Sequence, residues 1–139
     1  MASSSQSTSS SAPSLRPKWI WPVDGKLIRR FSPSSTQQGV DIAATKGKPV
    51  VAAAAGEVVY VGNSLKGYGN LIIVKHNENF LSAYAHNRNI LVKEGQRVTD
   101  RQHIGSVGIN NRRESALHFQ IRRNGKPVNP LQYLPTLSG

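Results

Sequence analysis

Short apolar runs interrupted by glycine dominate the chain from Trp19 onward, and they limit its fold more than any other feature. Between residues 50 and 76, three such runs follow one another: VVAAAA, EVVYV and NLIIVKH. The β-branched and aromatic residues in them suit a pleated surface, and glycine marks the turns between them. No window repeats apolar residues at the helical period of 3.6. The pattern predicts an all-β protein, folded as an antiparallel sandwich or an open barrel.

Individual strands can be placed from the alternation of apolar and polar residues. We expect strands over residues 26–31, 50–55, 57–61, 70–76 and 80–86, a strand that ends at Gly108, and a last strand that begins at Ala116. Asn124-Gly125 is a strong hairpin signal after that last strand. Within it, alternation places Leu117, Phe119 and Ile121 on an apolar face that packs inward, and residues 116, 118 and 120 on an outward face.

Composition narrows the possible chemistry. The 139 residues suggest one globular domain, and the absence of cysteine excludes thiolate metal sites, cysteine nucleophiles and disulfides. A formal net charge of +11 favours anionic partners such as nucleic acid, anionic lipid or an acidic wall polymer. The basic residues form no 5–8-residue block, and no nucleic-acid-binding module is recognisable, so nucleic acid is the least favoured partner. No apolar run approaches the roughly 20 residues of a transmembrane helix.

The N-terminal segment differs in composition from the rest. Residues 1–17 are rich in serine and lack the basic start and apolar stretch of a signal peptide. We expect them to be a disordered linker or an added leader, and residues 18–139 to form the domain.

A possible metal site begins at Gly39-Val40-Asp41, which precedes an apolar run. A zinc site of this kind needs a histidine four residues before the aspartate, where the chain has Gln37. A catalytic zinc needs about three protein ligands and an open water position, and a neutral amide oxygen suits harder cations. Among the four histidines, His76 and His103 lie beside turns and are interpreted as surface or hydrogen-bonded residues. The other two, His86 in SAYAH and His118 in ALHFQIR, are the candidates for a functional site.

The motifs GVD, VVAAAAGEVVYVG, GYGNLIIVKH, YAH, EGQRV, LHFQIR and VNP occur in an order that resembles the lysostaphin/LytM peptidase domain, from about Trp21 to Leu134. The resemblance implies one antiparallel LytM-type domain with a central groove. Within the family, GNSLKGYGNLIIVKHN, LSAYAHN and NPLQYLP are most similar to the NlpD-type lipoproteins of Gram-negative bacteria.

The resemblance also implies a degenerate active site. Active members hold zinc with an HxxxD motif and the second histidine of an HxH motif, while the first histidine of HxH and the YAH histidine assist catalysis. By position, Asp41, His86 and His118 remain, whereas Gln37 and Ala116 replace histidines. Loss of an outer-shell partner alone costs roughly 10–100-fold in metal affinity or activity, and loss of a ligand should cost more. We therefore expect no metal, no cofactor and no catalytic activity.

Degenerate members of the NlpD and EnvC type activate periplasmic N-acetylmuramoyl-L-alanine amidases, so the resemblance implies an amidase activator that acts on peptidoglycan hydrolysis. Its partners would be the amidase and peptidoglycan, and its place the periplasm, as an outer-membrane lipoprotein whose lipid anchor lies outside this sequence. Aromatic and arginine residues are good interface anchors, and the candidates are Tyr68, Tyr84, His86, His118 and Arg122. Two alternatives stay open: a zinc-dependent endopeptidase with altered ligands, and a non-catalytic wall-binding module.

Overall fold

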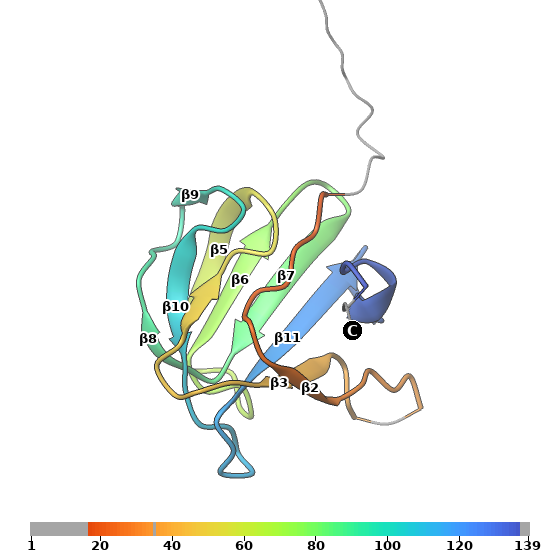
Figure 1. Ribbon diagram of the computed structural model, residues 1–139. Helices are drawn as coiled ribbons and strands as arrows, with labels where there is room; N and C mark the ends of the chain where they lie inside the picture. The colour runs from red at the N-terminus through yellow and green to blue at the C-terminus, as the bar shows by residue number, and fades with distance from the viewer. Residues whose placement is uncertain (1–16, 35, 137–139) are drawn as a thin grey trace, which may run out of the picture.

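The computed structural model describes residues 17–34 and 36–136, which form two antiparallel sheets (Figure 1). The larger sheet has the order β2-β3-β11-β7-β6-β5-β9, and β12 pairs with β11. Its strands are β2 (Lys26–Arg29), β3 (Val40–Ala43), β5 (Gly56–Gly62), β6 (Leu71–Lys75), β7 (Phe80–Ala85), β9 (Arg97–Val98), β11 (Ala116–Arg123) and β12 (Lys126–Val128). The smaller sheet has the order β4-β10-β8, with β4 (Pro49–Val51), β8 (Asn87–Ile90) and β10 (His103–Val107).

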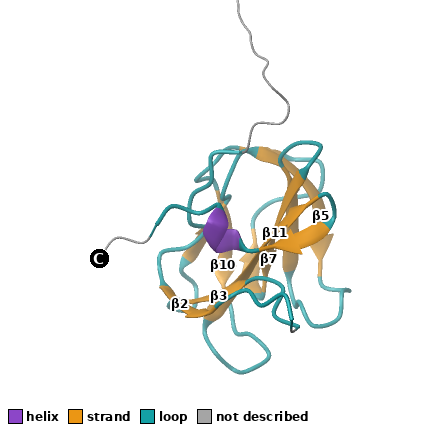
Figure 2. Cartoon of the chain, turned by 90° about the vertical axis from the view of Figure 1, so that its right-hand side faces the viewer, coloured by secondary structure: helices purple, strands orange, loops and turns teal. Residues whose placement is uncertain are grey.

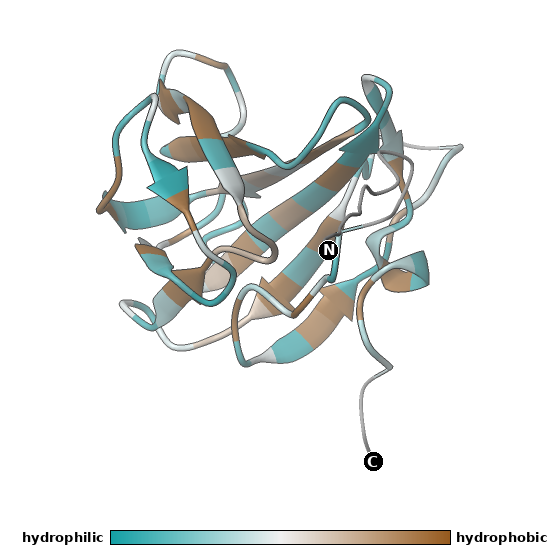
Figure 3. Cartoon of the chain, turned by 90° about the horizontal axis from the view of Figure 1, so that it is seen from above, coloured by the Kyte–Doolittle hydropathy of each residue, from teal (hydrophilic) through white to brown (hydrophobic). Residues whose placement is uncertain are grey.

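One hydrophobic core joins the two sheets into a sandwich. Val50 and Ile104 of the smaller sheet belong to the same buried cluster as Val74, Leu117 and Phe119 of the larger one. Hydrophobic and hydrophilic residues alternate along the strands of the larger sheet (Figure 3), which leaves its opposite face free to carry polar side chains. The all-β prediction is therefore confirmed, as is the inward apolar face of β11.

The last hairpin also forms as the sequence predicts. Strand β11 turns back into β12 through Asn124 and Gly125, whose φ angles are 52° and 82°. Two successive positive φ angles are what an Asn-Gly hairpin turn requires. After β12 the chain forms a 3-10 turn, η1 (Pro130–Gln132), the purple helix of Figure 2, which was not expected from the sequence.

The expected strand over residues 50–55 is wrong in its second half. Strand β4 ends at Val51, and Ala52, Ala53 and Ala54 run through the core without strand pairing. Their small side chains fit there, and their amides find other partners: Ala52 donates to the Gln102 carbonyl and Ala53 to the Tyr84 hydroxyl, both at 2.9 Å. Strand β8 was also not expected, because its sequence NRNI carries few residues that favour strands.

The segment expected to be a linker or leader, residues 1–17, lies outside the described residues except for Pro17. The described part of the chain includes no helix long and apolar enough to span a membrane.

Candidate functional site

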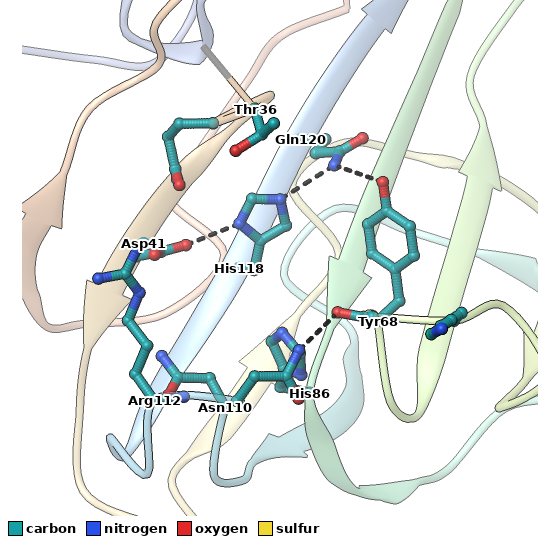
Figure 4. Close-up of a pocket in the computed structure, with 12 residues that line it drawn as sticks. Thr36, Asp41, Tyr68, His86, Asn110, Arg112, His118 and Gln120 are labelled. Carbon is teal, nitrogen blue, oxygen red and sulfur yellow. Dashed lines mark hydrogen bonds and ion pairs between the residues drawn. The ribbon is translucent and has the colours of Figure 1, made fainter.

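A polar groove of about 450 Å³ lies on the face of the larger sheet that is turned away from the core (Figure 4). Its floor is formed by β3 and β11, and its walls by the loops that follow β5 and β10. The lining residues are Thr36, Gln37, Asp41, Lys66, Gly67, Tyr68, His86, Asn110, Asn111, Arg112, His118 and Gln120. The structure thus brings together four of the predicted residues, Asp41, His86, His118 and Tyr68.

A row of paired side chains crosses the floor. Asp41 lies on β3, directly opposite Arg29 on β2 and His118 on β11. This register places Asp41 Oδ1 2.7 Å from His118 Nδ1, and Asp41 Oδ2 accepts a hydrogen bond from Arg29 Nη1 at 2.9 Å. Directly opposed residues on neighbouring strands have side chains close enough to interact. Both oxygens of the Asp41 carboxylate are therefore engaged by residues of the chain itself.

The row continues along β11 through side chains two residues apart. Arg122 Nε can only donate, so it fixes Gln120 Oε1 as its acceptor at 3.0 Å. The Gln120 Nε2 amide group then donates to His118 Nε2 at 2.9 Å, so the ring nitrogen of His118 is the acceptor. His118 consequently carries its proton on Nδ1 and donates it to Asp41. Arg122 also donates to Gln38 at 3.2 Å, at the end of the row.

The loop between β10 and β11 forms one wall of the groove and is tied to the same row. Glu114 accepts two hydrogen bonds from Arg29, at 2.8 and 2.7 Å, and a third from the Asn110 amide at 2.9 Å. The Arg29 hydrogen bonds lower the pKa of Glu114 to about 2. Burial by itself would raise the pKa of Asp41, but hydrogen bonds from His118 and Arg29 outweigh it, so the pKa lies below its ordinary value.

Gly39 allows the chain to approach β11 closely just before Asp41. A Cβ at this position would lie 2.3 Å from the Phe119 carbonyl oxygen and 2.8 Å from the Gln120 side chain. Only glycine fits there, which explains the glycine of the GVD motif. Gln37 lines the groove, and its amide donates to the Gly39 carbonyl at 3.0 Å.

His86 follows β7 in a left-handed backbone conformation, with φ 67°. Its amide donates to the Tyr68 carbonyl at 2.9 Å, and its ring centre lies 6.5 Å from that of His118. The pKa of His86 is lowered by burial and by the neighbouring His118. A non-glycine residue at positive φ costs energy, which surrounding contacts must offset. Here the strained backbone points the imidazole into the groove.

The predicted partner contact of Tyr84 is wrong. Tyr84 is fully buried, and its ring packs against Phe119 in the core between the sheets. Tyr84 was a candidate because it is aromatic, but its side chain lies in the core, whereas His86, two residues later and at positive φ, lines the groove. The hydroxyl of Tyr84 lies 2.7 Å from Ser82 Oγ, and burial raises the pKa of Tyr84 to about 12. Arg122 is half-buried and lines a hollow beside the groove, and Tyr68 is half-exposed within the groove, so both remain accessible.

Comparison with known proteins assigns this fold and groove to a family. Peptidase family M23 matches residues 35–130, which cover most of the two sheets and every residue of the groove floor. The chain belongs to peptidase family M23. Among solved structures, this M23 domain is similar to a zinc-containing peptidase from Vibrio cholerae, with TM-score 0.76 and 28% identity over 88% of this chain and 41% of that one. It is also similar to lysostaphin from Staphylococcus simulans, with TM-score 0.72 and 29% identity over 78% of this chain and 48% of that one.

Curated relatives of the M23 domain include lipoproteins and activators. It is 55% identical to the lipoprotein NlpD/LppB homolog of Pseudomonas aeruginosa, over 84% of this chain and 40% of that protein. It is 52% identical to the murein hydrolase activator NlpD of Escherichia coli K12, over 84% of this chain and 31% of that protein. The chain therefore spans well under half the length of these relatives.

The residues of this M23 domain do not fit the zinc that the family resemblance implies. Gln37 stands where a ligand histidine is expected, and Arg29 places a positive charge 2.9 Å from the Asp41 carboxylate. Within residues 17–34 and 36–136, no three His, Cys, Asp or Glu side chains cluster in a way that could hold a metal ion. We therefore derive no chemistry through a metal at this site.

Sequence reasoning missed Arg29 and Glu114, the two residues that complete the row. The spacing of Arg29 and Asp41 gives no local signal, because the two residues meet only through the pairing of β2 with β3. Glu114 lies 85 residues from Arg29 in the chain, in a loop without a recognisable motif. Composition offers a hint, because the chain has eighteen Lys and Arg residues but seven Asp and Glu residues, and a partly buried arginine needs an acceptor.

Proposed function

We propose that this M23 domain is a non-catalytic activator of periplasmic N-acetylmuramoyl-L-alanine amidases, and that its groove binds the amidase. The observation that carries the proposal is the state of Asp41. Its carboxylate is bonded on one side to Arg29 and on the other to His118, while Gln37 and Ala116 replace two histidines of the active family. The groove is kept although the groups for hydrolysis are not.

The groove has the properties of a binding site for a protein segment. It is preformed, with polar donors along its length and Tyr68 on one wall. Beside it, Tyr68, Leu71, Ile73 and Leu81 line a more apolar hollow of about 270 Å³ that ends at Arg122. An aromatic residue and an arginine next to an apolar hollow are typical of positions that dominate binding energy. Exposed Lys66 and Arg112 add positive charge to the rim.

The relatives support the same role and location. Proteins named murein hydrolase activator NlpD share about half of their residues with this chain over the M23 domain. Other relatives are named lipoproteins, including outer membrane antigenic lipoprotein B of Haemophilus influenzae, at 51% identity. We infer that the domain acts in the periplasm, as part of an outer-membrane lipoprotein, on hydrolysis of peptidoglycan.

The test is release of dye from labelled cell wall. The domain is first incubated alone, with or without a chelator, and is then mixed with each amidase of the host. We expect stimulation of at least one amidase, unchanged by chelation of the domain, and no release by the domain alone. Chelator-sensitive release by the domain alone would support a zinc endopeptidase, and co-sedimentation with wall without stimulation would support a wall-binding module.

Two variants, one in the groove and one in the hollow beside it, localise the binding surface. Tyr68→Ala and Arg122→Glu should each weaken amidase binding about 30-fold, because removal of a central anchor costs ~2 kcal/mol. Arg123→Glu is the matched control, because Arg123 is the next residue on β11 and lies over the Phe80 ring, away from the groove. Equal binding by Arg122→Glu and Arg123→Glu would place the surface elsewhere.

A further inference from the structure

Arg29, on β2, is a cation that lies beside the floor of the groove and contacts it through Asp41. Its side chain is 22% exposed, and its guanidinium contacts two carboxylates at once, Asp41 on β3 and Glu114 in the loop after β10. Arginine presents several donors in a fixed plane, so one side chain can hold two acceptors in a defined geometry. The contact with Glu114 uses both terminal nitrogens, which makes it bidentate.

The position of this cation matters because Asp41 is the surviving member of the family's HxxxD pair. A divalent cation at Asp41 would need a carboxylate oxygen that is free of other donors. Oδ2 is bonded to Arg29 and Oδ1 to His118, so a metal would have to displace at least one of them. It would also meet the charge of Arg29 at close range, in a place that is largely shielded from water.

Arg29 also organises the wall of the groove. Glu114, held by Arg29, accepts a hydrogen bond from the Asn110 side chain at 2.9 Å. Asn110 Oδ1 in turn accepts hydrogen bonds from the amides of Arg112 and Glu114, both at 2.9 Å. Asn110 and Arg112 line the groove. The conformation of this wall is thus connected to the floor through one guanidinium.

We propose that Arg29 is a fixed internal cation that replaces the metal of this family, both as the counter-ion of Asp41 and as the anchor of the groove wall. It follows that Arg29 excludes divalent cations from the site independently of Gln37. Restoring the histidine at position 37 is then insufficient to restore a metal site, and removal of Arg29 is required as well. This inference does not depend on the proposed function, because no amidase enters its test.

The test measures zinc binding by isothermal titration calorimetry, with elemental analysis after desalting. The variants are Q37H, Q37H/R29Q and the control Q37H/R30Q, which removes the same charge from the neighbouring exposed Arg30. We expect one zinc per chain in Q37H/R29Q, bound at least about tenfold more tightly than in Q37H. Tenfold is the lower end of the change in metal affinity that residues around the ligands cause. Q37H/R30Q should behave like Q37H.

Two results would overturn the inference: zinc bound as tightly by Q37H as by Q37H/R29Q, or the same gain in Q37H/R30Q. Thermal unfolding establishes that each variant is folded. If Q37H/R29Q does not fold because Asp41 and Glu114 repel each other, the triple variant Q37H/R29Q/E114Q removes that repulsion and takes its place.

The wall is tested separately through hydrogen exchange of the amides of Asn110, Arg112 and Glu114. E114Q keeps the pair between Arg29 and Asp41 but loses the charge that Arg29 holds in the loop. We expect these amides to exchange about tenfold faster in E114Q, since charge-assisted hydrogen bonds are the stronger ones and local opening controls exchange. Unchanged exchange in E114Q would show that Arg29 does not anchor the wall.

Discussion

Replacement of Tyr84 by phenylalanine should destabilise the fold and leave the groove unaffected. The Tyr84 hydroxyl accepts the Ala53 amide proton at 2.9 Å and lies 2.7 Å from Ser82 Oγ, in a region that water does not reach. Ser82 keeps a second partner, His76 Nε2 at 2.7 Å, but the Ala53 amide would lose the hydroxyl that accepts its hydrogen bond. A buried donor without an acceptor costs about 1–3 kcal/mol, so we expect a loss of ~2 kcal/mol.

Urea denaturation followed by fluorescence measures this loss. With an m-value of ~2 kcal/mol/M for a protein of this size, the midpoint should fall by about 1 M at an unchanged slope. Tyr60→Phe is the control, because its hydroxyl contacts Ser64 at an exposed position where water can replace it. We expect it to change stability by less than about 0.5 kcal/mol. A Tyr84→Phe loss as small as that of Tyr60→Phe, or a weakened amidase interaction of the folded variant, would refute the reasoning.

Two further predictions concern stability. Burial lowers the pKa of His76, so as pH falls through about 6.5 the unfolded chain binds a proton before the native one does. The free energy of unfolding should therefore decrease as the pH is lowered from 7.5 to 5.5. His76→Gln should reduce this pH dependence in urea titrations, and His86 should account for the part that remains. An unchanged pH dependence in His76→Gln would contradict the prediction. Gly39→Ala should lower the free energy of unfolding by about 3 kcal/mol in the same assay, because the added Cβ would meet the Phe119 carbonyl oxygen and push β3 away from β11. A decrease below about 1 kcal/mol would count against this close approach.

The candidate site was predictable from sequence where its residues belong to one strand or one motif. The family resemblance assigned Asp41 and His118 to one site, and alternation along β11 correctly placed His118 and Gln120 on the face away from Leu117 and Phe119. The prediction for Tyr84, on β7, was wrong because it used residue type alone, which does not say on which face of a sheet a side chain lies. The left-handed backbone of His86 ends that strand, and no sequence rule gives a positive φ to a histidine in YAH.

What the sequence by itself determined is the all-β class, the inward apolar face of β11 and the Asn-Gly hairpin, because these depend on the preferences of residues a few positions apart. Only the tertiary structure decided that Arg29 is the partner of Asp41 and Glu114, since the three residues come from separate segments and meet through the register of β2, β3 and β11. The same register decides whether Asp41 is open to a metal or closed by an arginine. Strand register is set by the packing of the whole apolar face and not by the polar residues that it brings together.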